Sequence, residues 1–276
     1  MRNTWLPALV GLLLLVHPSS TLAHGGYNDL IDAQTRKVEQ NPSDVGLRFE
    51  LANLHGLHGD LALALKDLDR VDALARGKFL TDFLRGQAYF VARDFARAKD
   101  ALERQLLSHP ESAHAWLLKA RAERELGQHE TSLADYREAL KRTESPEPDI
   151  VQEVAGALAA RGNKEEAAQV LAAGIERLGK IPSLMLRALD LEIEIKNFDA
   201  ALRRIEEARE AAPRPEPWMA RRAAVLGQAG RLEESRAAWK ALLAHLDALP
   251  EHDRTSRAMV QLAAEARKAM EQDQSR

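Results

Sequence analysis

The chain has 276 residues, with 39 lysines and arginines against 42 aspartates and glutamates, and it contains no cysteine. The absence of cysteine excludes disulfide bonds, thiol catalysis and thiolate metal sites. The nearly balanced charge gives no general attraction to nucleic acid or to an anionic membrane, so we expect neither as a partner.

The N-terminal segment predicts an export signal. The apolar run 6–16 is shorter than the ~20 residues that span a bilayer, Pro18 interrupts it, and residues 21–23 have the small-x-small form of a cleavage site. We therefore expect a signal peptide over residues 1–23 and a mature chain that begins at His24 and functions in the periplasm. An uncleaved N-terminal anchor is the alternative.

A small residue recurs along the rest of the chain at almost constant spacing. The intervals between its six occurrences are 34, 34, 35, 34 and 34 residues. The six residues are Ala64, Ala98, Ser132, Ala167, Ala201 and Ser235. Such a period indicates tandem repeats, each of which forms one supersecondary unit.

Two further positions follow the same period when the six small residues are taken as position 20 of each unit. Position 8 is small in five units and is Leu189 in the fifth; its residues are Ala52, Gly86, Ala120, Ala155, Leu189 and Ala223. Position 24 is large, with Leu68, Leu102, Tyr136, Leu171, Ile205 and Trp239. Small residues at positions 8 and 20 let two antiparallel helices approach closely, and the large residue fills the remaining gap. Turns are expected between the helices, near residues 58–60, 93–94, 127–128, 162–163, 196–197 and 230–231, several of them with a glycine to end the first helix.

This pattern resembles the tetratricopeptide repeat. The second unit shows it best, with Gly86, Tyr89, Ala98, Leu102 and Pro110. The resemblance implies an all-α fold, a right-handed α-solenoid of about six helix-turn-helix units over residues 45–249. Residues 24–44 are expected to hold an N-terminal capping helix, from residue 30 to residue 40.

Residues 250–276 are expected to hold a C-terminal capping helix and a tail. An amphipathic helix over residues 255–270 carries an apolar stripe that includes Met259 and Ala266. We expect it to cover the apolar edge left by Trp239, Leu242 and Leu246, because terminal repeats need a polar outer face. A helix that binds a partner is the alternative. Between the third and fourth units, the proline-containing segment 144–148 is expected to set a bend.

The resemblance also implies a binding groove on the concave wall, which is built from the first helices, especially their positions 2, 5, 9 and 12. In the first three units these positions and their neighbours give an apolar row beside a polar one. The groove residues are Phe49, Asn53, Phe83, Gln87, Phe90, Leu117, Arg121 and Arg124. Such a strip suits an extended peptide, because apolar pockets take side chains while amides bond its backbone, and the arginines suit a carboxylate. In the alternative interpretation the phenylalanines pack between helices and the polar row is a solvated face.

The chain shows no phosphate-binding glycine loop, nucleophile elbow or zinc-protease helix, so we expect no catalytic residue and no cofactor. A non-catalytic adaptor or scaffold that binds a protein or peptide is the favoured function. One alternative is an exported metal-handling protein. The amine and imidazole of a mature N-terminal His24 could chelate copper(II), and His55 and His58 could share a helix face. The other alternative is a docking subunit of an envelope enzyme complex.

Overall fold

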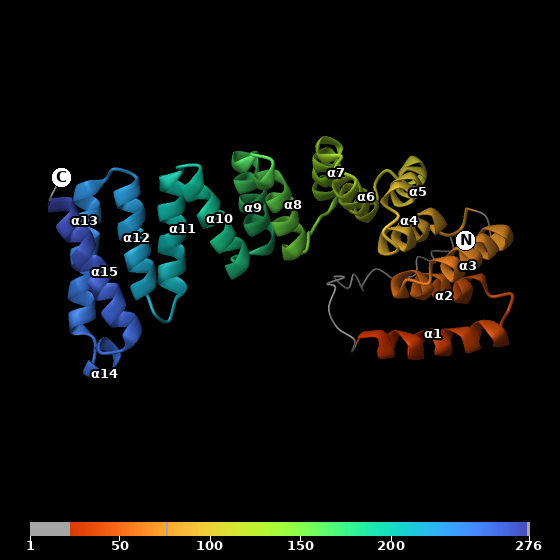
Figure 1. Cartoon of the computed structure of the whole chain (residues 1–276), viewed down its shortest axis with the longest axis horizontal. Helices are drawn as coiled ribbons and strands as arrows, with labels where there is room; N and C mark the ends of the chain where they lie inside the picture. The colour runs from red at the N-terminus through yellow and green to blue at the C-terminus, as the bar shows by residue number, and fades with distance from the viewer. Residues whose placement is uncertain (1–22, 76, 275–276) are drawn as a thin grey trace, which may run out of the picture. The chain divides into compact units, whose positions relative to one another are not determined.

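The computed structural model describes residues 23–75 and 77–274, and within them it contains fifteen helices and no strand (Figure 1). The expected signal peptide lies outside the described residues, apart from Ala23. The helices are α1 (Ala23–Gln40), α2 (Val45–His58), α3 (Leu61–Ala75), α4 (Thr81–Val91), α5 (Phe95–Ser108), α6 (Ala113–Glu125), α7 (His129–Arg142), α8 (Pro148–Ala160), α9 (Lys164–Leu178), α10 (Pro182–Glu194), α11 (Phe198–Ala211), α12 (Glu216–Gln228), α13 (Leu232–Ala248), α14 (Glu251–Arg254) and α15 (Arg257–Gln274). The all-α class is confirmed.

Helices α2 to α13 form six helix-turn-helix units, and each turn falls where the period predicts it. Position 15 of every unit has a positive φ, which is the left-handed conformation that closes the first helix. These residues and their φ values are Gly59 (99°), Arg93 (61°), Gly127 (74°), Gly162 (86°), Lys196 (59°) and Gly230 (75°). Two units therefore adopt the same turn without a glycine.

The two helices of a unit meet at positions 8, 20 and 24. All six residues at position 20 and all six at position 24 are buried. Gly86 shows how close the approach is, since a Cβ at this residue would lie 2.6 Å from Cγ of Leu102. Where position 20 is a serine, the hydroxyl donates a 2.8 Å hydrogen bond across the hairpin, from Ser132 to the carbonyl of Ala120 and from Ser235 to that of Ala223. Serine is thus accommodated without an unsatisfied polar group.

Positions 11 and 23 carry a polar contact between the two helices in the first and fifth units. In the first unit, Nδ1 of His55 lies 3.2 Å from Oδ2 of Asp67. In the fifth unit the acid is on the first helix instead of the second: Nη2 of Arg204 donates to Oε1 of Glu192 at 2.6 Å, and Glu192 is 4% exposed. Each pair joins the helices of its own unit.

The described chain divides into two compact parts. The first comprises residues 23–110 and 121–128, and the second comprises residues 111–120 and 129–274. The division falls within α6 rather than at the proline-containing segment 144–148. Contacts continue across that segment, because Tyr136 on α7 donates a 2.8 Å hydrogen bond to Glu153 on α8, and Arg177 on α9 donates to the carbonyls of Thr143 and Glu144.

The terminal helices cover the outermost units of their parts. Helix α1 begins at Ala23 rather than at the expected Leu30, and its Gln34 donates a 2.9 Å hydrogen bond to the carbonyl of Leu47 on α2. At the other end, Met259 and Ala266 of α15 belong to the buried cluster that contains Trp239, Leu242 and Leu246. Helix α15 thus packs on this apolar edge.

Candidate functional site

Helices α2 and α4 lie side by side and carry most of the expected groove residues. Asp44 begins α2 by accepting a 3.1 Å hydrogen bond from the backbone N–H of Leu47, as an N-cap residue does. Further along, Gly56 lies against α4 so closely that a Cβ there would be 3.2 Å from Cβ of Ala88. This contact holds the first helices of units one and two together, so that their equivalent positions neighbour one another.

The aromatic residues of the groove contribute to packing. Phe49 and Phe83 are half-buried and pack against the buried cluster that includes Leu68 and Leu84. The ring of Phe49 also lies 5.0 Å from that of Phe79, centroid to centroid. The alternative interpretation, in which the phenylalanines pack between helices, therefore applies to these two rings, although each remains partly exposed.

Two further apolar groove residues are also involved in packing. Phe90 contacts Phe95 edge to face, with centroids 5.4 Å apart. Leu117 is only 4% exposed and belongs to a core cluster of the second part, together with Leu133 and Tyr136. The expectation that Leu117 lines a groove is corrected, because position 5 of the third unit faces this core.

The amide residues of the groove, unlike its aromatic residues, have no partner within the described part of the protein. Asn53 on α2 and Gln87 on α4 both occupy position 9, and both are half-buried. Neither side chain forms a hydrogen bond to any described residue. An amide that is only partly solvated and has no protein partner can bond a peptide backbone.

The arginines of the groove lie in the segment 121–128, which belongs to the first part. Arg121 and Arg124 are both half-buried. Nη2 of Arg124 lies 3.6 Å from Oε1 of Glu125, so its charge is partly compensated within its own helix.

The histidines of the metal alternative are paired with carboxylates. Nδ1 of His55 faces Asp67, and the same carboxylate accepts a 2.9 Å hydrogen bond from Arg48. Nδ1 of His58 lies 2.8 Å from Oδ2 of Asp60. The side chain of His24 lies outside the described residues, so a copper site there stays a prediction. Within the described part of the chain, no group of three or more histidine, aspartate or glutamate side chains is placed to hold a metal ion.

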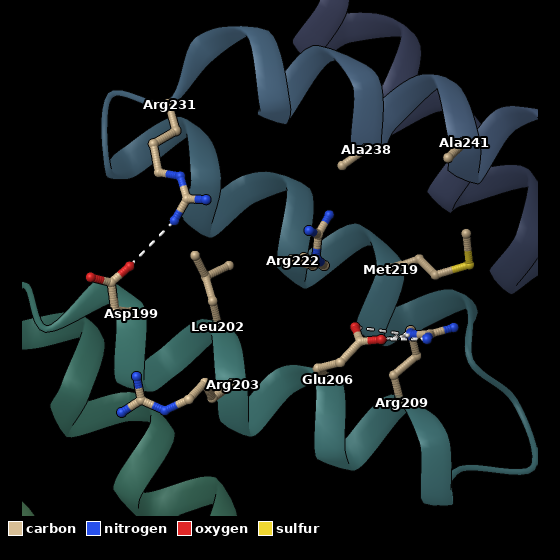
Figure 2. A pocket seen from close by; sticks show the side chains of 10 residues that line it. All are labelled: Asp199, Leu202, Arg203, Glu206, Arg209, Met219, Arg222, Arg231, Ala238 and Ala241. Atoms are coloured by element: carbon tan, nitrogen blue, oxygen red, sulfur yellow. Dashed lines mark hydrogen bonds and ion pairs between the residues drawn. The ribbon is translucent and has the colours of Figure 1, made fainter.

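A cavity of about 630 Å³ opens between α11, α12 and α13, all of which belong to the second part (Figure 2). Its wall is formed by Asp199, Leu202, Arg203, Glu206, Arg209, Met219, Arg222, Arg231, Ala238 and Ala241. From α12 it takes positions 4 and 7, whereas the expected groove uses positions 5, 9 and 12 of the first helices. The cavity is therefore a different surface, and the repeat pattern does not predict it.

Ion pairs neutralise part of the charge in this cavity. Arg209 donates hydrogen bonds of 3.1 Å to both carboxylate oxygens of Glu206, and Arg231 donates to Glu234 at 2.6 Å and to Asp199 at 3.3 Å. The hydrogen bonds from Arg209 hold the pKa of Glu206 below its usual value, and the charge of Arg222 acts in the same direction. The adjacent arginine pairs 203–204 and 221–222 are the only sequence signal that could have pointed here.

No helix in the described part of the chain is both long and apolar enough to cross a membrane.

The repeated hairpins, with a left-handed turn and small helix contacts in each, define a protein built from tandem two-helix repeats. The family model of the tetratricopeptide repeat matches residues 83–148. Within the matched residues the chain is similar to the tetratricopeptide repeat family, and its fold is of the protein-interaction type.

Solved structures of other repeat proteins are similar to parts of this chain. TTC0263, a thermophilic TPR protein from Thermus thermophilus, is 21% identical, with 62% of this chain and 92% of that chain covered at a TM-score of 0.48. YrrB, described as a TPR protein with an unusual peptide-binding site, is 22% identical over 66% of this chain and 94% of that chain, also at 0.48. A MamA fragment from Desulfovibrio magneticus RS-1 is 17% identical over 58% and 91%, at 0.47. No curated protein matches the sequence.

Proposed function

We propose that this chain is an exported, non-catalytic scaffold that binds an extended polypeptide segment across α2 and α4. The observation that carries the proposal is the pair of amides, Asn53 and Gln87. They occupy the same position on two packed helices and have no hydrogen-bond partner among the described residues. Their role is to bond the backbone of the segment, while the exposed portions of Phe49 and Phe83 contact its side chains.

The binding energy that can be removed without disturbing the fold comes from the two amides. A neutral hydrogen bond contributes about 0.5–1.5 kcal/mol, so two amides supply on the order of 2 kcal/mol. The aromatic rings belong to the packed core, so removing one of them would change stability together with binding. Variants of the amides therefore test the function more cleanly than variants of the rings.

The test is cross-linking of the purified protein to an envelope extract, with the bound proteins identified and their affinities measured. Asn53→Ala with Gln87→Ala is expected to weaken the main partner by at least about tenfold, with the helical circular dichroism unchanged. The matched control is Gln228→Ala with Gln261→Ala, which removes two exposed amides from α12 and α15. Equal capture by both double variants would reject the site on α2 and α4. Co-purification of an active enzyme would favour the docking-subunit alternative.

Export is tested separately, because it rests on the N-terminal segment alone. N-terminal sequencing of the protein from a periplasmic fraction is expected to begin at His24. Recovery of the intact N-terminus, or of the protein only in the cytoplasm, would reject the export part of the proposal and leave the binding site unaffected.

A further inference from the structure

The cavity between α11, α12 and α13 contains more positive charge than it neutralises. Its wall holds four arginines and two carboxylates, and Arg209 and Arg231 account for both carboxylates through their ion pairs. Arg203 and Arg222 form no hydrogen bond or ion pair with any described residue. Figure 2 accordingly draws bonds from Arg209 and Arg231 and none from Arg203 or Arg222. Neither guanidinium group is thus bound directly to a carboxylate, although the charge of Arg222 acts on Glu206 and Glu234.

The rest of the wall shows what kind of anion fits. Leu202, Met219 and Ala238 contribute an apolar surface beside the arginines. A small inorganic ion would neutralise the arginines and leave this apolar surface uncovered. A polypeptide segment that presents a carboxylate next to an apolar side chain satisfies both, and the volume of about 630 Å³ lies within the usual ~300–1,000 Å³ of ligand pockets.

We propose that this cavity binds an acidic side chain of an extended polypeptide partner, with Arg222 as the residue that binds the carboxylate and Arg203, whose side chain is directed away from Arg222 (Figure 2), as a further positive charge nearby. Arg222 is half-buried on α12 and therefore provides a partly desolvated contact, whereas Arg203 is exposed on α11.

The proposal goes beyond the site on α2 and α4. The two surfaces belong to different compact parts, and they are built from different helices. Variants of Asn53 and Gln87 leave the cavity unchanged, and variants of the cavity arginines leave α2 and α4 unchanged. Failure of one proposal can therefore be distinguished from failure of the other.

The test uses the full-length protein and a display library of random twelve-residue peptides. Peptides selected in an Arg222-dependent manner are expected to contain aspartate or glutamate beside an apolar residue. In fluorescence anisotropy, Arg222→Gln is expected to weaken them at least about tenfold, since a charge-assisted hydrogen bond is lost, and Arg203→Gln several-fold. The matched control is Arg221→Gln, one residue away on the same helix, whose arginine already pairs with Asp190. Its affinity is expected to stay within about twofold of the unmodified protein.

A double-mutant cycle identifies the contact itself. Changing the acidic residue of the peptide to its amide is expected to weaken binding to the unmodified protein and to have little further effect on Arg222→Gln. Selection of no Arg222-dependent peptide would overturn the proposal. An equal loss with Arg221→Gln would also overturn it, since that result indicates general charge attraction. Binding of succinate or inorganic phosphate without any peptide would assign the cavity to small anions instead.

Discussion

At the scale of single residues, glycines that look alike in the sequence occupy different environments. Gly86 on α4 faces Leu102, and a Cβ there would lie 2.6 Å from the Cγ atom. Gly156 on α8 has nothing within 4 Å of the place that its Cβ would take. The same substitution should therefore change stability in opposite directions.

Gly86→Ala is expected to lower the free energy of unfolding by about 1–3 kcal/mol, because overpacking at the helix contact exceeds the gain in helix propensity. Gly156→Ala is expected to raise it by about 0.5–1 kcal/mol, because only the propensity changes. Urea unfolding followed by circular dichroism measures both. Stabilisation by Gly86→Ala would show that the helices of the second unit separate more easily than the contact with Leu102 implies.

At the scale of the helix pair, the buried contact between α10 and α11 is the strongest electrostatic feature of the fifth unit. Arg204 binds both carboxylate oxygens of Glu192 through Nε, at 3.1 and 3.0 Å, and its Nη1 lies 3.5 Å from Sδ of Met185. Removal of one partner leaves a charge with little access to water.

Glu192→Gln is expected to lower the free energy of unfolding by about 3 kcal/mol, because Arg204 stays charged in a nearly buried position. Asp190→Asn, on the same helix, removes an exposed carboxylate that pairs with Arg221, and its expected effect is below about 0.5 kcal/mol. Thermal or denaturant unfolding of the two variants compares them directly. Similar small losses in both would mean that water reaches Arg204 despite its burial.

The periodicity of the sequence predicted the hairpins because it marks which residues are buried between the two helices of a unit. Small residues at positions 8 and 20 and a large one at position 24 define the helix contact, and the turn forms at position 15 even where Arg93 or Lys196 replaces glycine. The candidate site was harder to predict. Whether position 5 faces solvent or core depends on the neighbouring unit, as Leu117 shows. Which arginines of the cavity form no ion pair depends on which carboxylates are already paired. The repeat period does not show that.

At the scale of the whole molecule, the division into two parts predicts how unfolding will be observed. Within the described residues, the tryptophans Trp116, Trp218 and Trp239 all belong to the second part. Gly86 belongs to the first. Each part has its own buried cluster, and repeat proteins derive their stability from neighbouring units.

Gly86→Ala is therefore expected to shift the unfolding curve followed by circular dichroism while leaving the transition of tryptophan fluorescence within experimental error. Glu192→Gln, in the second part, is expected to shift both. Equal shifts of both signals by Gly86→Ala would show that the two parts unfold as one cooperative unit.

The reversed order of acid and base at positions 11 and 23 also limits how such a chain can be rearranged during evolution. Recombination within the interhelical turns could join α10 directly to α3. The product would place Asp67 opposite Glu192, two carboxylates with no cation between them. A crossover between complete units would keep each acid with its own base. Duplication and loss of whole repeats are thus compatible with this fold, whereas recombinants with mixed first and fifth hairpins should be eliminated.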